Sequence, residues 1–173
     1  MIRRAAITLL LLALAGCGFE PMYGGGSGTV LQADLSGIDV APIPDRTGQT
    51  LQQNLSDQLG GGNGTDYRLE VTLAQTDTGS GFRADEATTR INIMLTASYK
   101  LRRLSDDTIL LDGQAKAFSA YDVVESEFAT LTTRQDTLRG LAEELSRRIS
   151  TRLASYFRNQ EDSAPHEAAP AGD

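Results

Sequence analysis

Cys17 is the residue of this 173-residue chain with the clearest chemistry, because it is the only thiol and it directly follows an apolar run. Arg3 and Arg4 form a cationic head, and residues 5–15 carry no charge. About 11 apolar residues are too few for a membrane-spanning helix, which needs about 20, but they suit a secretory signal peptide. We therefore predict that residues 1–16 are a signal peptide that is cleaved before Cys17.

The residues at the cleavage point, Leu14-Ala15-Gly16-Cys17, resemble the lipobox of bacterial lipoproteins. The resemblance implies that the Cys17 thiol is acylated with diacylglycerol and that Cys17 becomes the first residue of the mature chain. The alternative is a buried, unreactive cysteine behind an ordinary signal peptide. Apart from the covalent lipid we expect no cofactor. With its one cysteine used as an anchor, the chain has none left for a disulfide, so packing must hold the fold.

The composition divides the mature chain into three parts. Residues 17–34 include Gly24-Gly25-Gly26-Ser27-Gly28, which predicts a flexible tether. A phosphate-binding loop is the alternative, but no Lys-Ser/Thr follows and no strand precedes these glycines. Residues 35–158 are the predicted domain. Residues 159–173 are rich in Ala, Pro, Glu and Asp and are predicted to be a disordered tail.

Charge and motifs argue against two classes of function. The formal charge is −7, and loss of Arg3 and Arg4 with the signal peptide makes it −9. An acidic chain is a poor match for nucleic acid, whose binding depends on neutralising phosphates. No Gly-x-Ser-x-Gly, metal-ligand spacing or Cys–His pair is present, and Asp106-Asp107 is typical of a hairpin turn. We therefore expect neither nucleic acid binding nor enzymatic activity.

Hydrophobic periodicity predicts four strands and two helices. Apolar residues alternate with polar ones in four segments, and the best of these spans residues 89–102, while apolar residues at steps of three or four mark two helices. The predicted strands are 38–43, 67–73, 89–102 and 108–120, and the helices are a short one through Leu51, Leu55 and Leu59 and a long one over 133–157. Residues 76–87 are interpreted as a loop, and residues 123–132 as either helix or a separate turn.

The order β-α-β-β-β-α predicts an α+β two-layer sandwich (α/β in the broad sense). One-sided alternation in the strands requires a mixed four-stranded sheet with two helices on one face. The first two strands should run parallel through the helix between them, and the hairpin strands antiparallel. Small residues on the inner side of 108–120 predict close approach of the long helix.

The alternation places five cations on the sheet face that the helices leave uncovered. In the predicted strands, Glu70 and Asp112 are the only acids that oppose them. The surface is interpreted either as an ordinary solvated face or as a binding surface for an acidic partner. The five cations are Arg68, Arg90, Lys100, Arg102 and Lys116.

Several short motifs, taken in their order along the chain, resemble the LPS-assembly lipoprotein (LptE) family. They are Cys17-Gly18-Phe19 at the mature start, Gln58-Leu59, Phe82-Arg83 and Gln135-Asp136. The likeness covers most of residues 14–157 and includes the element order. The chain departs from the family before the final helix, where Leu131 stands in place of a lysine.

The resemblance implies an outer-membrane lipoprotein on the periplasmic face that sits inside the LptD β-barrel. Its partners would be that barrel, lipopolysaccharide and, through the lipid on Cys17, the outer membrane; its role would be plug, assembly factor and lipopolysaccharide-binding element. Arg83 is the first candidate for a phosphate contact and Arg90 the second, followed by Lys100, Arg102 and Lys116. The alternatives are an auxiliary lipoprotein of a phospholipid-transporting ABC system and a scaffold lipoprotein.

Overall fold

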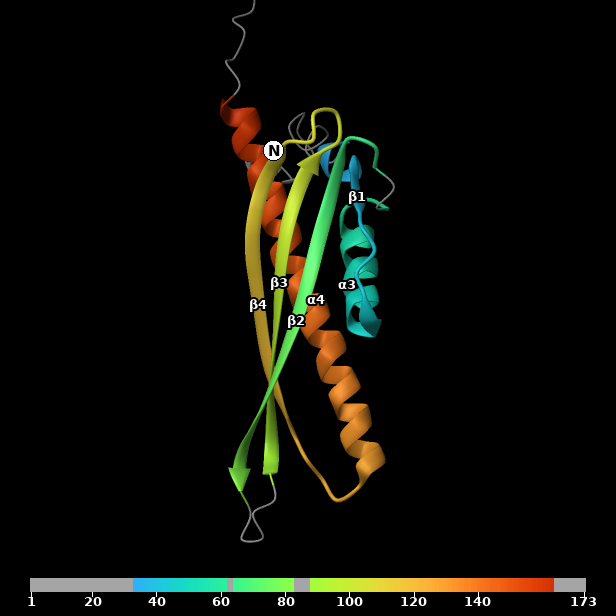
Figure 1. Cartoon of the computed structure of the whole chain (residues 1–173), viewed down its shortest axis with the longest axis vertical. Helices are drawn as coiled ribbons and strands as arrows, with labels where there is room; N and C mark the ends of the chain where they lie inside the picture. The colour runs from blue at the N-terminus through green and yellow to red at the C-terminus, as the bar shows by residue number, and fades with distance from the viewer. Residues whose placement is uncertain (1–32, 62–63, 83–87, 164–173) are drawn as a thin grey trace, which may run out of the picture. The chain divides into compact units, whose positions relative to one another are not determined.

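Four strands and two long helices follow one another in the order predicted from the sequence (Figure 1). The computed structural model describes residues 33–61, 64–82 and 88–163, with a short helical turn over 33–36. Within these residues, no helix combines the length and the apolar character needed to cross a bilayer. The elements are β1 (Ile38–Val40), α3 (Asp45–Gln58), β2 (Tyr67–Phe82), β3 (Thr88–Arg103), β4 (Ile109–Asp122) and α4 (Glu127–Ser163).

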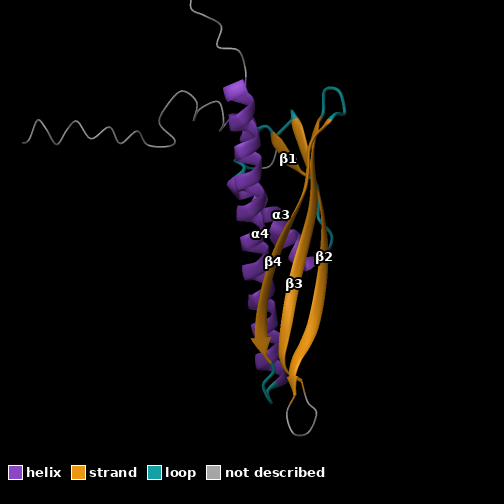
Figure 2. Cartoon of the chain, turned by 90° about the vertical axis from the view of Figure 1, so that its left-hand side faces the viewer, coloured by secondary structure: helices purple, strands orange, loops and turns teal. Residues whose placement is uncertain are grey.

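The strands form one mixed sheet in the order β1-β2-β3-β4. β1 pairs parallel with β2, and the β2–β3 and β3–β4 pairs are antiparallel. Both helices lie on the same side of the sheet, and no helix of the described residues covers the other side (Figure 2). The predicted two-layer α+β fold is therefore confirmed.

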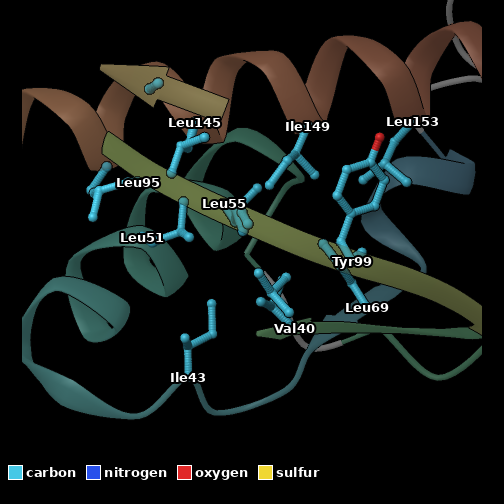
Figure 3. Packing of buried hydrophobic residues seen from close by; sticks show 14 of the residues in the cluster. Val40, Ile43, Leu51, Leu55, Leu69, Leu95, Tyr99, Leu145, Ile149 and Leu153 are labelled. Carbon is cyan, nitrogen blue, oxygen red and sulfur yellow. The ribbon is translucent and has the colours of Figure 1, made fainter. Parts of the chain in front are cut away.

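The core lies between the sheet and the helices (Figure 3). Strand alternation directs Leu69, Leu95 and their neighbours inward, and α3 and α4 contribute one apolar stripe each. Burial of these side chains supplies most of the favourable free energy of folding. The most deeply buried large residues are Ile38, Leu51, Leu55, Leu59, Leu69, Ile93, Leu95, Leu101, Leu145, Ile149 and Leu153.

The interpretation of residues 76–87 as a loop is wrong as far as Phe82. β2 continues to that residue and pairs with β3 almost residue for residue. Backbone hydrogen bonds to a long neighbouring strand stabilise this half of β2, although it contains Gly79. Its inward positions carry Gln75 and Asp77 rather than apolar residues, so the alternation that marks a half-buried strand is missing. Residues 83–87 lie outside the described residues.

α4 is longer at both ends than the predicted 133–157. Its start at Glu127 follows Ser126, whose side-chain oxygen accepts a hydrogen bond from the Ala129 N–H at 3.3 Å, as an N-cap does. The open question about residues 123–132 is thus answered largely in favour of helix. At the other end α4 continues to Ser163, so residues 159–163, predicted to belong to a disordered tail, are helical, and residues 164–173 lie outside the described residues.

Candidate binding surface on the open sheet face

The five cations predicted to emerge on the uncovered face do so. Each lies at a strand position on the face opposite the buried residues, as Arg68 does beside the buried Leu69. The two other candidates from the sequence, Cys17 and Arg83, lie outside the described residues. We call the face that carries Arg68, Arg90, Lys100, Arg102 and Lys116 the open face.

Acidic neighbours pair with four of these five cations. Arg102 contacts two of them, Asp107 at 3.0 Å and Glu70 at 3.7 Å. The other three pairs are Arg68–Asp39 at 3.0 Å, Arg90–Asp122 at 3.2 Å and Lys100–Asp112 at 3.6 Å. These pairs are exposed or half-exposed, so each adds little to stability, but together they cancel most of the positive charge of the surface.

The expectation that Glu70 and Asp112 alone oppose the cations is therefore wrong. Asp39 comes from β1, Asp107 from the β3–β4 turn and Asp122 from the last residue of β4. The strand register brings two of them to their partners, because it pairs Asp39 with Arg68 and Asp122 with Arg90, while the turn brings Asp107 to Arg102. The expected concentration of positive charge is replaced by alternating charges.

Lys116 is the exception among the five. Its side chain is exposed and has no ion-pair partner among residues 33–61, 64–82 and 88–163. A second cation lies at the same point of β4, because the Arg148 guanidinium donates a hydrogen bond from Nη1 to the Lys116 carbonyl oxygen at 2.8 Å. Arg148 also pairs with Glu144 at 2.7 Å. Lys116 is thus the cation of the open face that is available to an anion.

A shallow groove of about 470 Å³ lies on the open face next to Lys116. The register Thr76–Met94–Phe118 places three side chains in one row across β2, β3 and β4. Phe118 is 81% exposed and Met94 39% exposed, both unusual for large apolar residues on a solvated sheet face. The groove is lined by Thr76, Thr78, Asn92, Ile93, Met94, Phe118, Ser119 and Ala120.

The groove and the Lys116 ammonium group together suit a ligand that carries both an acyl chain and an anionic group. The side chains of Lys116 and Phe118 point to the same face of β4 from positions two residues apart. An apolar strip beside an unpaired cation can hold an acyl chain and an anionic group of the same molecule. The strand alternation places Met94 on the outer face, but the groove was not predicted from the sequence. The signal for it was the presence of two large apolar residues, Met94 and Phe118, at positions where the alternation calls for polar residues.

Comparison with known proteins shows a shared fold. No protein-family model matches the chain, and no curated protein matches it in sequence. Solved structures do match it. One is from Caulobacter crescentus CB15 and is assigned as a lipoprotein; it has 20% identity and a TM-score of 0.63, and the match covers 75% of this chain and 97% of that one.

Two further matches carry lipoprotein names. Rare lipoprotein B from Shewanella oneidensis has 9% identity and a TM-score of 0.56, with 72% of this chain and 96% of that chain covered. A minor lipoprotein from Acinetobacter baumannii has 16% identity and a TM-score of 0.51, with coverage of 69% and 92%. At these identities the likeness extends to the fold alone. The chain has the fold of these bacterial lipoproteins.

Proposed function

We propose that the chain is an outer-membrane lipoprotein, anchored through Cys17, that partners a large β-barrel of the LptD type. In this role it would act as plug and assembly factor while lipopolysaccharide is inserted into the outer leaflet. The lipobox resemblance, the order of the short motifs and the fold shared with lipoproteins support the proposal. The domain would lie at the periplasmic side and inside the barrel.

The observation that carries the lipid-binding part is the groove beside Lys116. Lipopolysaccharide combines acyl chains with phosphate groups, and the open face offers Met94 and Phe118 to the first and Lys116 to the second. Arg83 remains a predicted phosphate contact outside the described residues. Arg90, Lys100 and Arg102 are less available because an acidic neighbour pairs with each.

The partner is tested by purifying the full-length, lipidated protein from cells of its source organism. We expect a large outer-membrane β-barrel to co-purify with it. Recovery of an inner-membrane ATPase complex would instead favour the auxiliary lipoprotein of an ABC system. Depletion of the protein should lower surface lipopolysaccharide, and unchanged surface lipopolysaccharide would favour a scaffold role.

The lipid contact is tested with the two lysines of the chain as a matched pair. Lys116→Glu and Lys100→Glu change the net charge equally on the same face, but Lys116 is unpaired and Lys100 pairs with Asp112. We expect Lys116→Glu to lower the lipopolysaccharide retained in a pull-down about tenfold, and Lys100→Glu to lower it much less. Equal losses would indicate a general charge effect and remove Lys116 as a specific contact. Arg83→Glu tests the remaining candidate in the same assay, with barrel association unchanged.

A further inference from the structure

The beginning of α4 and the segment just before it present apolar residues to solvent instead of burying them. Val124 is 48% exposed, Phe128 80% and Leu131 52%. The helix first enters the core at Leu138 and Leu141, more than two turns later. We call Val124, Phe128 and Leu131 the helix-start patch.

The helix-start patch is held in place by hydrogen bonds. The Thr130 hydroxyl accepts a hydrogen bond from the Val124 N–H at 3.2 Å and donates one to the Val124 carbonyl at 3.3 Å. Arg134 then joins this part of α4 to β2 through Asp77 at 3.1 Å. These contacts connect the segment to the sheet but leave the apolar side chains of the patch exposed.

The same segment lacks the packing that usually stabilises a helix. It contains Thr130, Thr132, Thr133 and Thr137, and β-branched residues are poor helix formers. The hydroxyls of Thr132 and Thr133 donate hydrogen bonds to the carbonyl oxygens of Phe128 and Ala129, at 3.0 and 2.9 Å. These local hydrogen bonds add little to helix stability, because the exposed hydroxyls could form similar hydrogen bonds with water. Burial of Phe128 and Leu131 against another molecule would supply the missing stabilisation.

The charges beside the helix-start patch indicate what kind of molecule fits it. Glu125 and Glu127 are exposed and have no ion-pair partner among the described parts of the chain, and Arg134 is paired with Asp77. Two free carboxylates would repel the phosphates of a lipid headgroup. They complement a protein surface on which Lys or Arg surrounds an apolar pocket.

We propose that the helix-start patch docks into an apolar pocket with a basic rim on a protein partner. The identity of this partner rests on the proposed function, under which it is the β-barrel. Phe128 is the central side chain because aromatic residues that become buried at an interface dominate its binding energy. Glu125 and Glu127 set the orientation through the basic rim.

The test compares two pairs of exposed apolar residues, Phe128 and Leu131 in the helix-start patch and Leu104 and Ile109 beside the β3–β4 turn, which are 41% and 46% exposed. The full-length protein is co-expressed with the barrel, and the barrel retained after washing is measured. We expect Phe128→Ser/Leu131→Ser to lower retention about tenfold or more, and the control Leu104→Ser/Ile109→Ser to change it less than about twofold. Glu125→Lys/Glu127→Lys should lower retention too, because it reverses the charges facing the basic rim.

The outcomes separate this inference from the proposed function. If the unmodified protein retains the barrel and Phe128→Ser/Leu131→Ser retains it equally, the inference is overturned and the proposed function stands. If the unmodified protein retains no barrel, both fail. Loss of binding to phosphatidylglycerol vesicles in Phe128→Ser/Leu131→Ser, with barrel retention intact, would show a lipid as the occupant and overturn the inference. Unchanged circular dichroism of each variant confirms that it is folded.

Discussion

The phenol ring of Tyr99 lies across Gly113, its partner in the neighbouring strand, and fills the space that a side chain at position 113 would need. A β-carbon at position 113 would lie 2.6 Å from the Tyr99 hydroxyl oxygen and 2.7 Å from the Cζ carbon. Burial raises the pKa of the Tyr99 hydroxyl, and Arg152 opposes that rise only in part. The missing side chain in β4 therefore accommodates a tyrosine of β3, while α4 also packs against β4, as the small residues of that strand predicted.

Gly113→Ala is expected to destabilise the fold by about 1–3 kcal/mol, because the Tyr99 ring must move within a packed core. The measurement is the free energy of unfolding in urea. Gly140→Ala is the matched control. A β-carbon there meets nothing within 4 Å, so in the exposed helix it should stabilise by about 0.5–1 kcal/mol. A Gly113→Ala variant as stable as the parent would show that the Tyr99 ring can adopt another conformation in the core without loss of stability.

Ile93→Asp and Met94→Asp place the same charge on opposite faces of β3. Ile93 is fully buried and Met94 lies on the open face, so the first should cost several kcal/mol of a total of about 5–15 and unfold most of the protein. The second should leave folding largely unchanged. Thermal unfolding followed by circular dichroism distinguishes them, and a normal melting curve for Ile93→Asp would mean that the strand faces are inverted.

Ser146→Ala is expected to cost about 1 kcal/mol, because it removes a hydrogen bond between the two helices. Ser146 Oγ accepts from Gln58 Nε2 at 2.9 Å and donates to the Glu143 carbonyl at 2.8 Å. Ser150, one turn later, has a buried hydroxyl without a partner among the described residues. Ser150→Ala should thus be neutral or stabilising. Chemical denaturation of both variants checks the contrast, which would be refuted by equal losses.

The pKa of Glu144 provides a test of the ion pairs on the surface of α4. Hydrogen bonds from Arg148, and then Arg147, hold the pKa of the Glu144 carboxyl below its ordinary value. A lowered folded-state pKa means that this stabilisation is complete above the ordinary pKa and is lost as the pH falls through the lower, folded value. We expect Arg148→Ala to raise the Glu144 pKa in an NMR titration. Arg139→Ala, which breaks a pair with Asp136 instead, should leave it unchanged.

An element could be predicted from the sequence where one of its faces meets the core. β3 was predicted almost to its bounds because residues from Ile91 to Leu101 alternate without interruption. The far half of β2 was missed because its inner position Asp77 meets Arg134 rather than an apolar side chain. Helical spacing identified α4 only where it is packed, so its exposed start was left open.

The surface could be predicted in position but not in charge. Alternation places Arg68 and Arg90 on the open face, since period two follows from strand geometry. Their partners Asp39 and Asp122 lie on other strands, and only the register brings them within 3.0 and 3.2 Å. Register is not visible in a single sequence when turn lengths are unknown.

The hydrogen bond from Arg148 to the carbonyl of Lys116 has a consequence for solubility. β4 is the outermost strand on its side of the sheet, and such a strand can act as a template for pairing with another copy of the chain. Because the Arg148 guanidinium is bonded to that carbonyl, the amide of an incoming strand would meet a bulky charged group at this point of the edge. Crowded copies are thereby hindered from joining into one continuous, aggregating sheet.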